Sequence, residues 1–285
     1  MNNQTDNTPL IVGFVADLMF TVRIETALSP LGYQMRWVGQ AADIAPAGEA
    51  TPNPQPGEPL QGQSGALFEQ ITLWQPALLI FDLGNEAIPW QRWIALLKSS
   101  PATRRIPVLC YGAHVDVATL QAARDAGADE VVARSRFASA LPELVGRLAR
   151  RPDTGGIQAA CAEPLSELAI KGLEAYNRGA YYDAHEELEF AWKADPGPGR
   201  DLYRAILQIA VAYYQIERGN YRGALKMLLR VRQWLEPLPD TCRGVDVAQL
   251  RQDTIAVHEA LLQLGPDRLT DLDRSLFRPV SYQTP

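Results

Sequence analysis

Cysteine is scarce in this 285-residue chain, long apolar runs are absent, and basic residues form no tract. The three cysteines are Cys110, Cys161 and Cys242. Their odd number and irregular spacing match neither a disulfide framework nor a metal site, which favours reduced thiols and a cytoplasmic location. No apolar run approaches the ~18 residues that a membrane span needs, so we expect no role for a membrane. The first nine residues also lack the basic and apolar regions of a signal peptide.

The charge balance argues against nucleic acid as a partner. Asp and Glu number 33 against 27 Lys and Arg, so the net charge is −6. Binding of nucleic-acid phosphates needs clustered basic side chains, which this sequence does not show. The hydrophobic content of 47% is that of a globular protein, and the length suggests two domains with separate cores.

Short apolar runs alternate with amphipathic stretches over residues 10–150. The apolar runs, each predicted to be a buried strand, are 10–16, 34–38, 77–81, 108–111 and 130–133. The amphipathic stretches, each predicted to be a helix, are 20–28, 66–74, 89–98, 117–126 and 138–148. This alternation predicts an α/β domain, a doubly wound parallel sheet in flavodoxin-like order with helices on both faces. Residues 39–65 are rich in Gly, Pro and Ala, and we interpret them as a flexible insertion.

Functional residues of such a sheet lie at the carboxyl ends of its strands. The residues at those ends are Asp17, Asp82, Gly112 and Arg134. Three of these residues lie in segments with a recognisable pattern. Asp82 lies in ALLIFDL at 77–83, Gly112 in IPVLCYGAH at 106–114 and Arg134 in AGADEVVAR at 126–134. These segments resemble the response-regulator receiver family over roughly residues 10–150.

The receiver resemblance assigns a role to each of the four positions. It implies that Asp82 matches the phosphate-accepting aspartate, and that Asp17 remains from an acidic pair that binds Mg²⁺. Gly112 stands where the family has a Ser or Thr that senses the phosphate, and Arg134 stands in place of a Lys.

Two departures from the receiver pattern change the chemistry. Without a hydroxyl at position 112, nothing there can bond a phosphoryl oxygen and draw in the following loop. Arg134 keeps the positive charge but not the compact geometry of an ammonium group. Asp17 and Asp82 could still supply two oxygen ligands to Mg²⁺. We therefore expect a degenerate receiver that serves as a docking or dimerisation module, and the alternative is a phosphorylatable response regulator that uses Asp82.

The second half of the chain has a different pattern. Residues 151–163 contain Pro and Gly-Gly and are predicted to be an interdomain linker. Residues 164–265 predict an all-helical domain, with helices over 165–178, 181–193, 201–218, 221–235 and 247–264. The polar tail 266–285 is expected to be extended. A short internal repeat, RGAYYDA at 178–184 and RGNYRGA at 218–224, indicates helix pairs similar to those of tetratricopeptide proteins.

The second of these helices carries the most chemically suggestive residues. His185 falls on its apolar stripe, and Glu189 lies one turn further on, so the two side chains can meet. Glu186 points about 100° away from His185. The next helix is apolar on most sides and bears a narrow polar strip that includes Arg204 and Gln208. We expect Arg204 to pair with Glu189, partly buried, with His185 and Gln208 beside them.

Three segments of this region resemble a bacterial family known as domain of unknown function 309. They are YNRGAYYDAHEELEFAW at 176–192, YRAILQIAVAYY at 203–214 and GNYRGA at 219–224. The resemblance covers about residues 165–262 and implies a helical bundle with a polar cluster, but no established reaction. In that family a His often stands where this chain has Gln215, which weakens any mechanism that needs two histidines.

The cluster around His185 has three interpretations. It is a structural hydrogen-bonded group, a site for a ligand or partner, or the centre of a metal-dependent hydrolase whose candidate residues are His185, Glu186, Glu189, Arg204 and Gln208. Metal hydrolase helices carry two imidazoles one turn apart, whereas this helix has one. His258 also precedes a Glu, but it stands among apolar residues and is predicted to be a core residue.

These observations together predict a regulatory, non-enzymatic protein in which a degenerate receiver is joined to a helical binding module. No cofactor is expected, and a divalent metal at His185, Glu186 and Glu189 is the alternative. The expected partner is another protein or a second copy of the chain, and a small ligand is the alternative.

Overall fold

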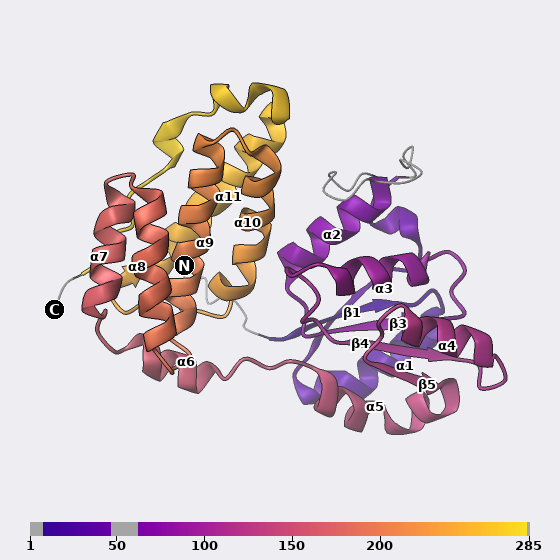
Figure 1. Cartoon of the computed structure of the whole chain (residues 1–285). Helices are drawn as coiled ribbons and strands as arrows, with labels where there is room; N and C mark the ends of the chain where they lie inside the picture. The colour runs from indigo at the N-terminus through magenta and orange to yellow at the C-terminus, as the bar shows by residue number, and fades with distance from the viewer. Residues whose placement is uncertain (1–7, 47–61, 284–285) are drawn as a thin grey trace, which may run out of the picture. The chain divides into compact units, whose positions relative to one another are not determined.

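The computed structural model of the chain describes residues 8–46 and 62–283 (Figure 1). The chain divides into two compact units, and the boundary in the sequence falls between Arg151 and Pro152. Each unit has its own hydrophobic core and is described by itself.

The first unit is built on a five-stranded parallel sheet with the strand order β2-β1-β3-β4-β5. Its strands are β1 (Leu10–Phe14), β2 (Gln34–Trp37), β3 (Leu78–Asp82), β4 (Val108–Gly112) and β5 (Glu130–Ala133). All residues of β3 and β4 are buried, because helices cover both faces of the central strands. The predicted doubly wound, flavodoxin-like sheet is therefore confirmed.

Five helices cover this sheet. They are α1 (Leu18–Leu28), α2 (Gly62–Trp74), α3 (Trp90–Ser99), α4 (Val117–Asp125) and α5 (Arg134–Leu148). Helices α1 and α5 bury Ile24 and Leu144 in one core, while α2 and α3 bury Leu67 and Trp93 in the core on the opposite face (Figure 1). Within the predicted insertion 39–65, residues 41–43 form a short 3-10 helix and α2 begins at Gly62, while residues 47–61 lie outside the described part of the chain.

The second unit is helical. Its helices are α6 (Thr154–Cys161), α7 (Glu167–Asn177), α8 (Tyr181–Ala194), α9 (Arg200–Glu217), α10 (Tyr221–Leu235) and α11 (Val247–Leu264). The bounds of α7 to α11 lie close to the predicted ones. Helix α9 packs against both α8 and α10, as expected for a helix that is apolar on most sides (Figure 1). Gly172 allows α7 and α8 to cross closely, since a Cβ there would lie 2.6 Å from Leu188 Cγ.

Three parts of this unit differ from the sequence-based expectations: the linker, the segment after α10 and the C-terminal tail. The predicted irregular linker contains helix α6, whose first turn is capped by Asp153 and whose last residues, Ala160 and Cys161, are buried. A short hairpin, β6 (Thr241–Cys242) and β7 (Val245–Asp246), follows α10 and has no counterpart in the prediction.

The tail expected to be extended is instead packed on the bundle. It forms two 3-10 helices at Pro266–Asp271 and Arg274–Leu276. The ring of Phe277 stacks on Tyr213 with centroids 3.9 Å apart, and the side chain of Asn177 both donates to and accepts from the backbone of Val280. Scattered apolar residues in a polar segment give no periodic signal, but each can fill a gap in an existing core.

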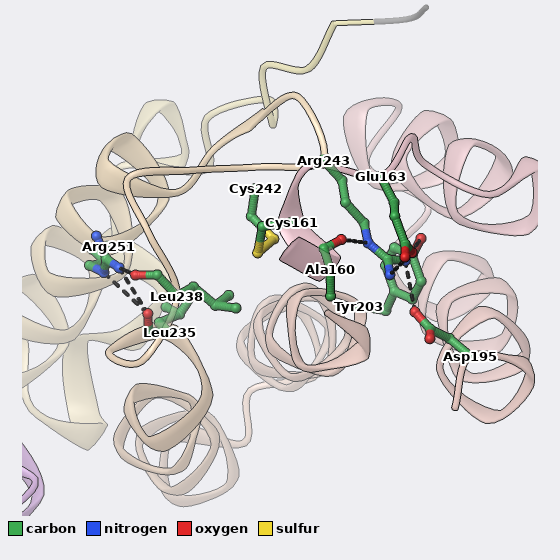
Figure 2. The surroundings of a disulfide bond; sticks show 10 residues. All are labelled: Ala160, Cys161, Glu163, Asp195, Tyr203, Leu235, Leu238, Cys242, Arg243 and Arg251. Carbon is green, nitrogen blue, oxygen red and sulfur yellow. Dashed lines mark hydrogen bonds and ion pairs between the residues drawn. A yellow bond between two sulfur atoms is a disulfide. The ribbon is translucent and has the colours of Figure 1, made fainter. Parts of the chain in front are cut away.

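The expectation of reduced thiols is wrong for two of the three cysteines. Cys161, at the end of α6, and Cys242, in the hairpin, form a disulfide across 81 residues of sequence (Figure 2). Cys110 is a free, buried thiol in β4. Spacing along the sequence carried no signal for this pair, because the bundle alone brings α6 and the hairpin together. Over residues 8–46 and 62–283, no helix is both long enough and apolar enough to cross a membrane.

Candidate functional site

At the carboxyl edge of the sheet, Asp82 is bound by an arginine of the same unit. Asp82 ends β3 and is 5% exposed. Its Oδ2 lies 2.6 Å from Nη2 of Arg134, which follows β5 and begins α5. Its Oδ1 accepts a hydrogen bond of 3.0 Å from the Gly84 amide. Both carboxylate oxygens thus have partners, and a cation of the chain neutralises the charge.

Asp17 does not join this pair. Its Oδ1 accepts hydrogen bonds from the amides of Met19 and Phe20, at 3.0 and 3.1 Å, and so caps the first turn of α1. The carboxylate expected to bind Mg²⁺ therefore already satisfies backbone donors at a helix N-terminus.

Gly112 ends β4 where two leucines leave little room for a side chain. A Cβ at this position would lie 3.3 Å from Leu120 Cδ2 and 3.4 Å from Leu83 Cβ. The departure from the receiver pattern is therefore slightly steric as well as chemical, because a Ser or Thr here would require Leu120 to shift by a few tenths of an ångström.

Tyr111, the residue before Gly112 in β4, belongs to the same edge, although it was not among the predicted site residues. The guanidinium carbon of Arg134 lies 5.5 Å from the Tyr111 ring centroid and 5.2 Å from that of Phe20. Burial, followed by the negative charge of Asp82, raises the pKa of the Tyr111 hydroxyl well above its usual value. The two aromatic rings thus lie against the guanidinium, while the ion pair is buried at Asp82 and open to solvent at Arg134, whose side chain is 46% exposed.

In the helical unit, the predicted pairing of Arg204 with Glu189 is wrong. Glu189 Oε1 instead pairs with Lys193 Nζ at 3.1 Å, one turn further along α8. The Arg204 guanidinium carbon instead lies 4.8 Å from the Trp192 ring centroid and 4.4 Å from that of Trp234. A lysine at the i+4 position reaches Glu189 without crossing between helices, and the indoles cover the guanidinium.

The other two candidates on α8, His185 and Glu186, lie near Tyr182. The half-buried His185 ring has its centroid 6.3 Å from that of Tyr182. Glu186 is exposed on the same outer surface, where its charge is the main cause that raises the pKa of the Tyr182 hydroxyl. Among the described residues, no three His, Cys, Asp or Glu side chains are placed to hold a metal ion together.

Arg204 is the centre of a group that we call the tryptophan–arginine cluster. Its members are Trp192 on α8, Arg200 and Arg204 on α9, and Arg230 and Trp234 on α10. Arg200 lies 6.0 Å from the Trp192 ring centroid, and Arg230 lies 5.3 Å from that of Trp234. The spacing of four residues between Arg200 and Arg204 is the sequence signal that could have located the cluster.

The predicted candidate Gln208 lies one turn beyond Arg204 on α9. Its Oε1 is buried and has no hydrogen-bond partner among the residues that the structure describes. The same holds for the indole Nε1 atoms of Trp192 and Trp234. Buried polar groups in proteins are normally hydrogen-bonded, so the two indole atoms mark the cluster as chemically incomplete, and Gln208 adds an unpartnered oxygen one turn further along α9.

Arg243 forms a second buried arginine centre, next to the disulfide (Figure 2). Its side chain is 4% exposed, and its Nη1 lies 2.7 Å from Asp195 Oδ2 and also donates to the Tyr203 hydroxyl. Its Nε donates to the Ala160 carbonyl oxygen at 3.1 Å, and its Nη2 lies 3.2 Å from Glu163 Oε2. The network joins α6, the loop after α8, and the hairpin, which indicates a structural role.

Burial of His258 predicts that stability depends on pH. His258 is 2% exposed, as expected of a core residue, and burial, with the charge of Arg232, lowers its pKa to about 4. In the unfolded chain the pKa is about 6.5, so between these values the unfolded state binds more protons. The free energy of unfolding should therefore fall by up to ~3 kcal/mol as the pH drops from about 6.5 to 4.

Urea unfolding at a series of pH values measures this dependence. A His258→Gln variant, which cannot take up the proton, should lose the part of the dependence that lies in this window. An equal pH dependence in the variant and the natural chain would contradict the assignment to His258.

The fold and these sites define a protein with a receiver-like α/β unit and a helical unit that contains two arginine centres. Residues 169–227 match the family described as domain of unknown function (DUF309). This match confirms the resemblance of the helical unit, over a shorter stretch than residues 165–262. The parallel sheet in receiver-like order agrees with the other resemblance.

Known proteins similar to parts of the chain include one sequence relative and several structures. An uncharacterised protein of Aquifex aeolicus is 26% identical over 87 residues, which are 30% of this chain and 26% of that protein. The chain thus spans about a quarter of the length of this relative. The signal receiver domain of a signal transduction histidine kinase from Syntrophus aciditrophicus has 18% identity and a TM-score of 0.38, over 49% of this chain and 89% of that one. A response regulator from Thermotoga maritima has 17% identity and a TM-score of 0.34, over 50% and 97%.

Proposed function

We propose that this chain is a non-enzymatic regulatory protein, in which an internal ion pair replaces phosphorylation in the receiver-like unit and the helical unit binds a partner or a small ligand. The observation that carries the proposal is the 2.6 Å contact between Arg134 Nη2 and Asp82 Oδ2. A carboxylate held this way is a poor nucleophile, because its charge is shared with a guanidinium and its lone pairs are engaged.

Binding of Mg²⁺ at this edge would break two existing interactions, the helix cap made by Asp17 and the ion pair between Asp82 and Arg134. Asp17 would have to leave the α1 N-terminus, and removal of such a cap costs ~1 kcal/mol. Asp82 is buried, so separation from Arg134 would leave its charge without a nearby cation unless the metal replaced it. The resident arginine thus supplies the positive charge that Mg²⁺ supplies in a phosphorylatable receiver.

Exposed apolar side chains next to this edge support protein contact as the mode of action. Leu18 and Met19 are each 79% exposed, and Val22 is 60% exposed, on the first turns of α1. Residues at i and i+4 share a helix face, so Leu18 and Val22 form a contiguous apolar surface beside Asp17. Exposed apolar groups of this kind are typical of surfaces that contact other proteins.

The phosphorylation mimic beryllofluoride tests the proposal. With Mg²⁺ present, we expect it to leave the backbone amide shifts of Asp82 and its neighbours unchanged in the natural chain, because Arg134 occupies the carboxylate. In an Arg134→Ala variant the carboxylate loses its cation, and we expect Mg²⁺ alone to shift these amides. Saturable shifts in the natural chain that disappear in Asp82→Asn would show a phosphorylatable site and overturn the proposal.

Two further parts of the proposal concern location and chemistry. The cytoplasm stays the proposed location, although the disulfide removes the argument from reduced thiols.

Over the described residues, no observation specifically favours a hydrolase centred on His185, Glu186 and Glu189, since Glu189 is paired with Lys193 and Glu186 faces the outer surface.

A further inference from the structure

The geometry around Arg204 leaves the edge of a guanidinium available for a ligand. The guanidinium carbon lies over the rings of Trp192 and Trp234, 4.8 and 4.4 Å from their centroids, so it contacts the faces of both indoles. The five N–H groups of a guanidinium lie in its plane and point outward from its edge. Among the described ion pairs none involves Arg204, so no carboxylate of that part of the chain claims this edge.

Positive charge is concentrated around the same two indoles. Arg200 lies against Trp192 and Arg230 against Trp234. Burial contributes most to lowering the pKa of Arg204, and the charges of Arg230 and Arg200 lower it further, while Asp201 opposes them. The guanidinium groups of Arg200, Arg204 and Arg230 thus lie around the same two indoles, in a chain whose net charge is −6. Like charges held this close favour a bound anion.

The hydrogen-bonding groups at the cluster indicate what kind of anion fits. The indole Nε1 atoms of Trp192 and Trp234 can only donate, whereas Gln208 Oε1 can only accept. All three are buried without a partner among the described residues, and Trp234 is 1% exposed. Oxygens of an anion can accept from the indoles and from Arg204, and an oxygen that keeps a proton can donate to Gln208. A carboxylate offers only two oxygens, whereas a protonated phosphate offers both functions on one tetrahedral group.

We propose that the tryptophan–arginine cluster binds a phosphate-type oxyanion, meaning inorganic phosphate or a phosphate monoester. The site is reachable from solvent, because Arg200 is exposed and Trp192 and Arg204 are half-buried. A guanidinium fork matches phosphate geometry, and stacking on two indoles holds the fork rigid. The inference gives a ligand class to the proposed binding role of the helical unit, and it is independent of the state of Asp82.

Titration of the full chain with inorganic phosphate tests the inference. Sodium chloride keeps the ionic strength constant, and the indole N–H signals of ¹⁵N-labelled protein are followed by NMR. We expect saturable shifts for Trp192 and Trp234 and none for the other four tryptophans, all of which lie in the first unit. A second titration with acetate separates phosphate from carboxylate, and we expect it to shift these signals weakly and without saturation.

Arginine variants then locate the site. Arg204→Gln should weaken phosphate binding by about tenfold to a hundredfold, since charge-assisted hydrogen bonds are lost. The matched control is Arg222→Gln, which removes the same charge from an exposed position on α10 and should leave the affinity unchanged. If Arg204→Gln does not fold, Arg200→Gln at the exposed rim should still weaken binding severalfold.

Distinct outcomes would overturn the proposal. They are the absence of saturable indole shifts with phosphate, an equal response to acetate, or an equal loss of affinity in Arg222→Gln and the cluster variant. Failure here would leave the beryllofluoride result unaffected, because that experiment reports on Asp82 in the other unit, so the two proposals can fail separately.

Discussion

Replacement of Cys242 by serine is expected to lower the free energy of unfolding of the helical unit by about 2–4 kcal/mol. The disulfide closes a loop of 81 residues in the unfolded chain, and such a constraint removes conformational freedom that the variant regains. Cys161 is the last residue of α6, so loss of the bond should also loosen α6 from the bundle (Figure 2). Urea unfolding, together with hydrogen exchange of the α6 and α9 amides, measures both effects.

Reductant provides the matched control for this prediction. It should destabilise the natural chain by a similar amount and have no further effect on Cys242→Ser. A Cys110→Ala variant, which removes the free thiol of the other unit, should leave the response to reductant intact. Equal urea midpoints for the natural chain with and without reductant would show that the bond contributes nothing to stability.

Replacement of Arg243 by methionine is expected to cost about 3–5 kcal/mol of stability. Arg243 is the cation within 2.7 Å of the partly buried Asp195, and it also satisfies the Ala160 carbonyl oxygen and the Tyr203 hydroxyl. Methionine fills a similar volume but leaves these polar groups without their partner. The largest part of the cost is the uncompensated Asp195 carboxylate, whose side chain is 15% exposed.

The Lys193–Glu189 pair is the control for this second prediction. Its atoms lie 3.1 Å apart and the two side chains are 57% and 38% exposed, so Lys193→Met should cost less than about 1 kcal/mol. Combining Arg243→Met with Asp195→Asn should recover part of the loss, because the unpaired charge is then removed. Equal destabilisation by Arg243→Met and Lys193→Met would refute the argument from burial.

Close packing at Gly199 is consistent with the importance of Arg243. A Cβ at position 199 would lie 2.7 Å from Arg243 Nη2, so the loop after α8 has been shaped around the guanidinium. By their Pro and Gly content, residues 195–199 predict only a break between helices. A glycine required by a side chain that follows it by more than 40 positions leaves no local signal.

The candidate sites were predictable to different extents. Asp82 and Arg134 were placed at one edge of the sheet, because parallel strands bring their carboxyl ends together, but their direct contact was not foreseen. Arg204 and Gln208 were predicted to lie on a partly buried polar strip of α9, and both side chains are half-buried. The partner chosen for Arg204 was wrong, because helical periodicity shows which face a residue occupies and not which residue of the neighbouring helix stands opposite.

The sequence by itself determined the alternation of strands and helices and the central place of α9, because these depend on apolar patterns among residues a few positions apart. The receiver-like order of the sheet followed from that alternation and from the right-handed crossovers of parallel strands. Tertiary structure alone decided that Cys161 meets Cys242, that Arg243 meets Asp195, and that two tryptophans enclose Arg204. Each of these contacts joins side chains from different segments, and its geometry follows from how whole elements pack rather than from any local pattern of residues.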